Sequence, residues 1–166
     1  IDIWGVIHNG IKLNVDAVNV LSELDNLRKD YVLLTNAPRP NLDVIKFLNK
    51  LGLDDKKSSR VYTSGQVSLD YLTKEKKGLK FFHLGPERDF NLFNDFKLFK
   101  QNKVKDADYI ICTGLYDEHL ELEYYKKFLS PFVDKEMVCT NPDLIVNRGN
   151  KIEYCAGSVA KVFEEI

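Results

Sequence analysis

Polar residues follow three short apolar runs of this chain, at the points where buried strands would end. Asp2 lies in the opening Ile-Asp-Ile-Trp-Gly, Thr35 and Asn36 follow a pair of leucines, and Thr63 follows Val-Tyr. Ligands of parallel sheets bind at the carboxyl ends of the strands, so these residues could meet at one site. A carboxylate beside hydroxyl and backbone donors suits phosphate chemistry, because Asp can attack phosphorus while the donors hold phosphoryl oxygens.

Other chemically active residues also have structural explanations. In the turn Asn141-Pro142-Asp143, Asp143 either makes an Asx turn or lines a substrate site, and the pattern leaves both open. The histidines at positions 8, 83 and 119 lack the short spacing of a metal cluster. This spacing favours structural or solvent-facing roles for them.

Apolar runs alternate with segments of helical periodicity, which is typical of βα units around parallel sheets. Strands are predicted over 31–34, 60–63, 79–84, 109–112 and 137–140, and helices over 41–51, from 64 onward, around 122–129 and at the C-terminus. Gly52 suits a left-handed cap after the helix over 41–51, and Ser64 suits the N-cap of the next helix. Four phenylalanines three residues apart, from Phe90 to Phe99, favour a helix with a buried aromatic face over a nucleotide-stacking surface.

We therefore predict an α/β protein with two sheets. The strands that end at Asp2, Leu34 and Tyr62 should form one parallel sheet, and the three later strands should form another. One continuous sheet through all six strands would contradict this prediction.

The composition excludes several classes of protein. The 166 residues carry 24 Lys plus Arg and 25 Asp plus Glu, without the basic surface that nucleic-acid binding requires. No apolar run matches a membrane span or a signal peptide. Three cysteines without close pairing favour reduced thiols and a cytoplasmic location. The chain starts in a strand-like run at Ile1 and ends in an uncapped helical pattern, so we expect a piece of a longer protein.

Several motifs resemble the haloacid dehalogenase (HAD) superfamily. Asp2-Ile3-Trp4-Gly5-Val6-Ile7-His8-Asn9-Gly10 and Leu33-Leu34-Thr35-Asn36-Ala37-Pro38-Arg39 look like its first two motifs. Tyr62-Thr63-Ser64, Phe82-His83-Leu84-Gly85, Thr140-Asn141-Pro142-Asp143 and Cys155-Ala156-Gly157 are similar to its class IIA branch, which is NagD-like and nitrophenylphosphatase-like. The resemblance covers nearly the whole chain. It implies a Rossmann-like parallel-sheet core beginning at 1–65, an inserted α/β cap at 66–155, and a helix at 156–166 that leads back toward the core, whose remainder would be absent.

The resemblance also implies roles for single residues. Asp2 matches the nucleophile that forms an aspartyl-phosphate, and Thr35 matches the hydroxyl that binds the phosphoryl group, with Asn36 beside it. We place Asn141 and Asp143 in the substrate-binding set as well.

A Mg²⁺ ion is implied by the same resemblance. Its ligands would be the carboxylate of Asp2, the backbone carbonyl of Trp4, and an acid from a later motif. That acid, and the lysine that stabilises the phosphate, are expected downstream of the terminal helix. Gly5 matches the turn glycine of the first motif.

Position 4 departs from the phosphatase pattern, in which an Asp protonates the leaving alcohol and later activates water. The indole of Trp4 can do neither. Loss of a general acid or base commonly costs about 10² to 10⁴ in rate.

We therefore expect a Mg²⁺-dependent HAD phosphatase that acts on a small phosphorylated metabolite through an aspartyl-phosphate. Two alternatives stay open. One is a weakened ligand-binding or regulatory protein, and the other is a carbon-centred, dehalogenase-like hydrolase that uses no metal. We expect neither nucleic acid nor membrane as a partner, and assembly into a homo-oligomer is left open.

Overall fold

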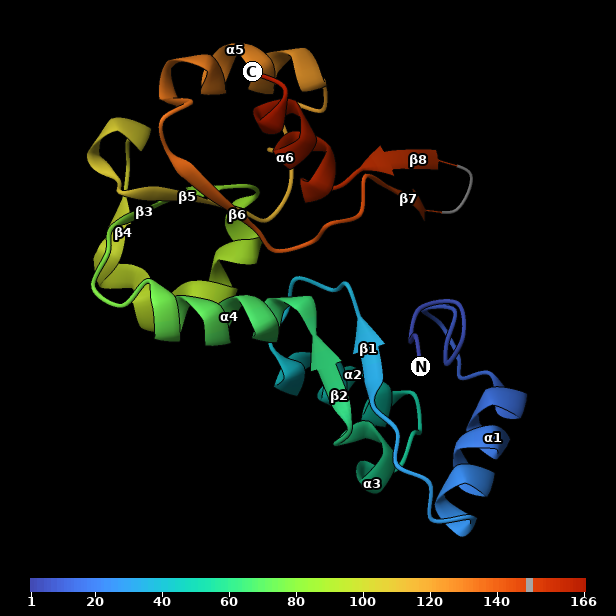
Figure 1. Cartoon of the computed structure of the whole chain (residues 1–166). Helices are drawn as coiled ribbons and strands as arrows, with labels where there is room; N and C mark the ends of the chain where they lie inside the picture. The colour runs from blue at the N-terminus through green and yellow to red at the C-terminus, as the bar shows by residue number, and fades with distance from the viewer. Residues whose placement is uncertain (149–150) are drawn as a thin grey trace. The chain divides into compact units, whose positions relative to one another are not determined.

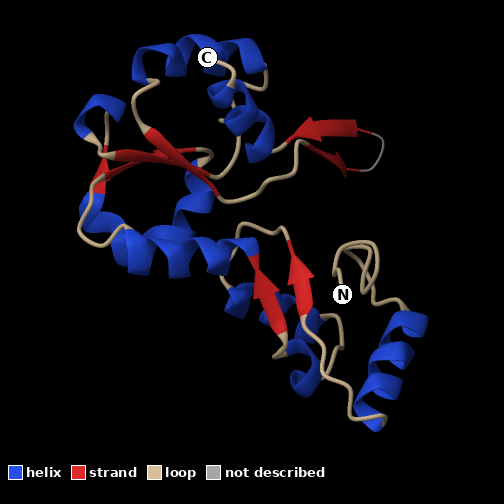
Figure 2. Ribbon diagram, in the orientation of Figure 1, coloured by secondary structure: helices blue, strands red, loops and turns tan. Residues whose placement is uncertain are grey.

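The chain forms two α/β units in the computed structural model, which describes residues 1–148 and 151–166 (Figures 1 and 2). The units are Ile1–Val67 and Ser68–Ile166. Each contains its own parallel sheet, so the predicted α/β class and the separation into two sheets are confirmed.

The first unit is built around a small parallel sheet. Its elements are α1 (Val15–Asn26), β1 (Leu33–Thr35), α2 (Asn41–Lys50), α3 (Asp55–Ser58), β2 (Val61–Thr63) and the start of α4 (Ser64–Glu75). Strands β1 and β2 pair in parallel, and Asp2 forms a parallel bridge with Leu34 of β1. The N-terminal segment, β1 and β2 therefore lie side by side, as predicted.

One face of this sheet carries the core of the first unit. Ile3, Leu33 and Val61 are buried there against Leu21 of α1 and Leu48 of α2. Burial of each such side chain stabilises the fold by about 1.5–3 kcal/mol.

Helix α2 ends as its sequence predicts. Gly52 has φ +101°, a conformation that costs glycine little, and its N–H donates to the carbonyl of Asn49 at 2.9 Å. The N–H of Leu53 donates to the carbonyl of Leu48 at 3.0 Å, which satisfies another carbonyl at the helix end. This arrangement confirms the left-handed cap.

The second unit has a four-stranded parallel sheet in the order β4-β3-β5-β6. After α4 its elements are β3 (Phe81–Leu84), the 3₁₀ helix η1 (Glu87–Phe99), β4 (Lys100–Gln101), η2 (Val104–Asp106), β5 (Tyr109–Cys112), α5 (Leu122–Leu129), η3 (Ser130–Phe132), β6 (Glu136–Cys139), β7 (Ile145–Arg148), β8 (Lys151–Tyr154) and α6 (Ala156–Glu164). Strands β7 and β8 form a separate antiparallel hairpin.

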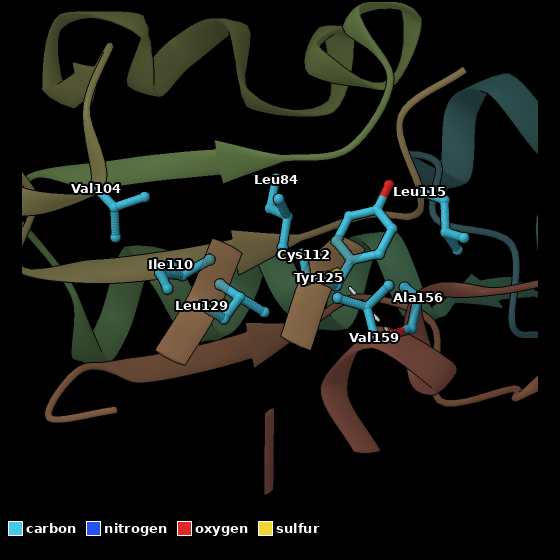
Figure 3. Close-up of a cluster of buried hydrophobic side chains, with 9 residues drawn as sticks. All are labelled: Leu84, Val104, Ile110, Cys112, Leu115, Tyr125, Leu129, Ala156 and Val159. Atoms are coloured by element: carbon cyan, nitrogen blue, oxygen red, sulfur yellow. Dashed lines mark hydrogen bonds between the residues drawn. The ribbon is translucent and has the colours of Figure 1, made fainter. Parts of the chain in front are cut away.

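Each face of the four-stranded sheet has its own core. Phe81 and Tyr109 pack on one face with Leu72 of α4. The other face carries a cluster of residues from β3, β5, α5, α6 and the connecting segments (Figure 3). Its buried members are Leu84, Val104, Ile110, Cys112, Leu115, Tyr125, Leu129, Ala156 and Val159. The helix predicted over 156–166 therefore packs within the second unit, and the predicted domain boundaries at 65 and 155 stay predictions.

The phenylalanine-rich segment forms η1, and its aromatic face is buried as predicted. The segment consists of two short helical pieces joined by a kink at Phe93, which has φ −111° and ψ 20°. Within each piece a 3₁₀ helix has about 3.0 residues per turn, so side chains three positions apart lie on one side. Phe93 is completely buried, and Phe90, Phe96 and Phe99 pack against the same cluster. The stacking-surface interpretation of this segment is therefore not needed.

No helix in the part of the chain that the structure describes combines the length and apolarity needed to cross a membrane.

Candidate active site

Asp2 and Trp4 project from the same side of the N-terminal segment. Ile3 is 1% exposed between them, and the side chains of Asp2 and Trp4 are exposed. Successive side chains of an extended chain point to opposite sides, so residues two apart share a side. Because Asp2 bridges Leu34, this exposed pair lies beside the carboxyl end of β1.

A tight loop follows Trp4 and returns the chain to the first segment. Gly5 has φ +78°, and nothing lies within 4 Å of the Cβ that another residue would add, so the requirement for glycine is conformational. The N–H of Gly5 donates to the carbonyl of His8 at 2.8 Å, and that of Ile7 donates to the carbonyl of Ile3 at 2.9 Å. Gly5 is thus a turn glycine, as the resemblance implied.

Contacts within this loop hold the indole of Trp4. A Cβ on Gly10 would lie 3.1 Å from the Cη2 atom of Trp4, so glycine allows the ring to pack closely there. The ring of His8 meets the indole edge-on at a centroid distance of 5.4 Å, and Phe47 of α2 meets His8 in the same manner at 5.2 Å. The indole is still 56% exposed.

His8 is a buried, neutral support for this loop. Burial lowers its pKa, although the negative charge of Asp2 opposes the shift. Its Nδ1 atom accepts the N–H of Gly10 at 2.8 Å, which leaves the proton of the neutral ring on Nε2. If Nδ1 were protonated, its N–H would point at the N–H of Gly10 and the hydrogen bond would be lost. His8 therefore does not replace the proton-carrying Asp that position 4 lacks.

The loop after β1 rests on the first turn of α4. The Oγ1 atom of Thr35 accepts the N–H of Ala37 at 3.2 Å. The carbonyl of Ala37 in turn accepts the hydroxyl of Ser64 at 3.1 Å and the N–H of Gly65 at 3.2 Å. A Cβ on Gly65 would lie 2.5 Å from the carbonyl oxygen of Arg39, so only glycine allows this approach.

The predicted N-cap of α4 is wrong by one residue. The cap is Thr63, whose Oγ1 atom accepts the N–H of Gln66 at 2.9 Å. A capping side chain reaches the N–H two or three residues ahead, and Ser64 is already the first residue of the helix. Its hydroxyl instead ties the helix to the loop after β1.

The first unit thus gathers four of the predicted site residues, Asp2, Trp4, Thr35 and Asn36, at the carboxyl edge of its sheet. Their chemical roles stay predictions. His8, Gly10 and Gly65 support them. The sequence favoured a structural role for His8 but predicted no supporting role for the two glycines. Positive φ and close backbone contact depend on tertiary packing, which a single sequence does not display.

The other predicted site residues, Asn141 and Asp143, lie in the second unit after β6. Asn141 makes the Asx turn, because its Oδ1 atom accepts the N–H of Asp143 at 3.0 Å. The turn rests on α6, since a Cβ on Gly157 would lie 2.5 Å from the carbonyl oxygen of Asp143. A part for either residue in substrate binding stays a prediction.

Two oxygen donors of the first unit suit a hard cation. They are the exposed carboxylate of Asp2 and the backbone carbonyl of Trp4, to which no backbone N–H donates among the described residues. Trp4 pairs with His8 through the peptide groups on either side of it, which leaves its own carbonyl available. Mg²⁺ binds through few carboxylates and keeps several waters. Three or more His, Cys, Asp or Glu side chains gather nowhere in the described ranges. A metal-binding role for Asp2 and Trp4 stays a prediction.

Comparison with known proteins identifies a family of hydrolases. Residues 1–98 match the family model of haloacid dehalogenase-like hydrolases. A haloacid dehalogenase-like hydrolase from Brucella suis 1330 is 31% identical, with a TM-score of 0.83 over 99% of this chain and 60% of its own. No curated protein matches the sequence significantly.

Two more distant structures share the fold. The p-nitrophenyl phosphatase from Archaeoglobus fulgidus is 19% identical, with a TM-score of 0.74 over 99% of this chain and 62% of its own. NagD from E. coli K-12 is 22% identical, with a TM-score of 0.69 over 99% and 63%. The chain therefore spans somewhat under two thirds of the length of these relatives. Since the family model matches more than half of its residues, this chain belongs to the haloacid dehalogenase-like hydrolase family.

Proposed function

We propose that this protein is a phosphatase that cleaves a small phosphate monoester through an aspartyl-phosphate on Asp2. The observation that carries the proposal is the exposed carboxylate of Asp2 beside the carboxyl end of β1, where Thr35 begins a loop held by the backbone. The family is one of hydrolases, and a phosphatase from Archaeoglobus fulgidus shares the fold.

In the first step Asp2 attacks phosphorus, the bond from phosphorus to the ester oxygen breaks, and the leaving group departs with the electron pair as an oxyanion. Because neither Trp4 nor His8 supplies a proton, this oxyanion takes its proton from water. Thr35 suits the binding of a phosphoryl oxygen, because its Oγ1 atom already accepts the N–H of Ala37 and keeps its own proton to donate. The amide of Asn36 would supply a second donor. Water then attacks phosphorus of the aspartyl-phosphate, which releases phosphate and restores the carboxylate.

Mg²⁺ would be held by the carboxylate of Asp2 and the carbonyl of Trp4. When bound, the ion neutralises charge on the phosphate. If the protein bound no Mg²⁺ by calorimetry and worked equally well in chelator, we would adopt the metal-free, carbon-centred alternative, which halide release would support.

The test compares phosphate release from p-nitrophenyl phosphate by wild type, Asp2→Asn and Thr35→Ala. Asp2→Asn should abolish turnover and leave the free energy of unfolding nearly unchanged, because Asp2 is exposed. Thr35→Ala should lower kcat/KM by about tenfold, since it removes one hydrogen bond to the phosphoryl group. Asp30→Asn removes another exposed carboxylate and should behave as wild type. Equal activity in wild type and Asp2→Asn would show that Asp2 is not the nucleophile.

A second candidate function is ligand binding without turnover. It is favoured by one observation, that neither Trp4 nor His8 can deliver a proton to the leaving group. Tight binding of a phosphate ester with no release of phosphate would support this candidate.

A further inference from the structure

We propose that the indole of Trp4 is the binding surface for the leaving group, and that the substrate therefore carries an aromatic ring on its phosphate ester. The proposal rests on the proposed function, because the leaving group is placed by the attack of Asp2 on phosphorus.

The exposure of Trp4 is the first observation. Trp is among the largest apolar side chains and is usually well buried, but here it is 56% exposed between Ile3 and Ile7, each 1% exposed. The chain does bury large aromatic side chains elsewhere, as at Phe81 and Phe93. The indole thus offers a broad apolar surface at the edge of the sheet where Asp2 lies.

The second observation is that the indole is held in place before any ligand binds. The indole packs closely on Gly10 and makes a T-shaped contact with His8, which is itself fixed by Phe47 and by the N–H of Gly10. A ring held by its surroundings loses little conformational freedom when a ligand stacks on it, so more of the contact energy appears as affinity. The loop therefore serves to orient Trp4.

The third observation is the position of Trp4 relative to Asp2. The two residues are two apart on an extended segment and share a side, which separates their Cα atoms by about 6.6 Å. In an attack by Asp2, the ester oxygen leaves from the side of phosphorus opposite the carboxylate. The group attached to that oxygen then lies beyond the phosphate, at a distance that an indole two residues along can reach.

The test uses two inert phosphonates of similar shape, benzylphosphonate and cyclohexylmethylphosphonate, in the presence of Mg²⁺. Wild type should bind the benzyl compound roughly threefold to tenfold more tightly, the usual size of an aromatic pair contact. Trp4 is the one tryptophan of the 166 residues, so the difference in emission between wild type and Trp4→Phe reports on it. Benzylphosphonate should change this emission.

Three variants test whether the preference for benzylphosphonate comes from stacking on Trp4 or from the apolar loop in general. Trp4→Leu should bind both phosphonates equally, and Trp4→Phe should keep part of the preference for the benzyl compound. Ile11→Ala removes an apolar side chain that is 82% exposed in the same loop, and it should keep the full preference. A benzyl preference that survives in Trp4→Leu would overturn the proposal, as would equal affinity of wild type for the two phosphonates.

Phosphate release from benzyl phosphate and cyclohexylmethyl phosphate, both esters of alkyl alcohols, distinguishes the two proposals. Hydrolysis of both with equal KM would overturn the stacking proposal and leave the phosphatase intact. A benzyl preference in binding without any phosphate release would support stacking and contradict the phosphatase. A lower KM for benzyl phosphate, lost in Trp4→Leu, would support both.

Discussion

The two parallel sheets of this chain differ at their carboxyl edges. At the edge of the first, Asp2 and Trp4 are exposed, and the neighbouring loops are held by backbone contacts. At the edge of the second, His83 and Thr113 are 6% and 4% exposed, and His83 Nε2 lies 2.8 Å from Thr113 Oγ1. At the second edge, His83 near the end of β3 and Thr113 after β5 satisfy each other and are closed to solvent.

This difference teaches how to weigh polar residues at strand ends. A carboxylate left exposed while its loop is fixed by other groups can meet a ligand. An imidazole whose hydrogen bond goes to a buried hydroxyl contributes to stability instead. The same contrast separates Asp2 from His8, which lies in the first motif but is buried and bonded to Gly10.

The largest expected effect is a decrease in the free energy of unfolding in acid, caused by protonation of His83 at the second edge. Burial, with the nearby charge of Lys100, lowers the pKa of His83 to about 4 from 6.5. The stabilisation that comes from keeping His83 neutral is complete above pH 6.5. It decreases as the pH falls toward 4, because the imidazole binds a proton in the unfolded chain before it does so in the folded protein. The loss should reach up to about 3 kcal/mol.

This loss is measured by urea unfolding of wild type and His83→Gln between pH 7 and 4. The variant keeps a donor for Thr113 but cannot titrate, so its free energy of unfolding should decrease less steeply with falling pH. If the free energy of unfolding fell with pH equally steeply in wild type and His83→Gln, the burial of His83 at the second edge would be contradicted.

The next effect concerns chemistry at the first edge. Trp4→Asp should raise the rate on alkyl phosphates by up to roughly 10², because a carboxylate there can protonate the alcohol and activate water. Aryl phosphates such as nitrophenyl phosphate should gain less, since their leaving groups depart without a proton. Phosphate release from both classes is compared with that of Trp4→Asn, which fits the same space but can neither give up nor take a proton. An equal gain in Trp4→Asn would contradict the acid-base explanation.

The smallest effect concerns the support of the first edge. Gly65→Ala places a Cβ 2.5 Å from the carbonyl oxygen of Arg39 and should lower the free energy of unfolding by about 1–3 kcal/mol. Gly114→Ala, at the second edge, meets only Pro86 at 3.5 Å and an oxygen of Asp89 at 4.0 Å, and should change it by less than about 0.5 kcal/mol. Chemical unfolding of both variants measures the difference. Equal decreases in the free energy of unfolding in the two variants would show that the loop after β1 does not depend on close contact with α4.

Much of the fold could be predicted because its signals are local. The strand over 109–112 has the predicted bounds. Strands β2 and β3 begin one and two residues later than predicted, and β1 and β6 differ by one or two residues at both ends. Gly52 ends α2 through its own backbone conformation, and the spacing of the phenylalanines matches the period of the short helical pieces on either side of the kink at Phe93. These features depend on residues close in sequence.

The support of the site could not be predicted because it depends on contacts between distant residues. Gly65 lies more than twenty residues after Arg39, which it contacts in the loop after β1. Phe47 reaches His8 from α2. The cap of α4 was misplaced for a related reason. Thr63 and Ser64 are both good caps, and only the position of the first helical turn decides between them.

The pairing of β5 with β6 has a consequence for chemical labelling. Cys112 and Cys139 are partners in the register of these strands, and burial raises the pKa of both thiols. The thiolate is the reactive form, so a thiol reagent reaches completely buried Cys112 only when this part of the sheet opens. The rate at which Cys112 reacts under native conditions would therefore measure how often the centre of the second unit opens, without denaturant and without any substitution.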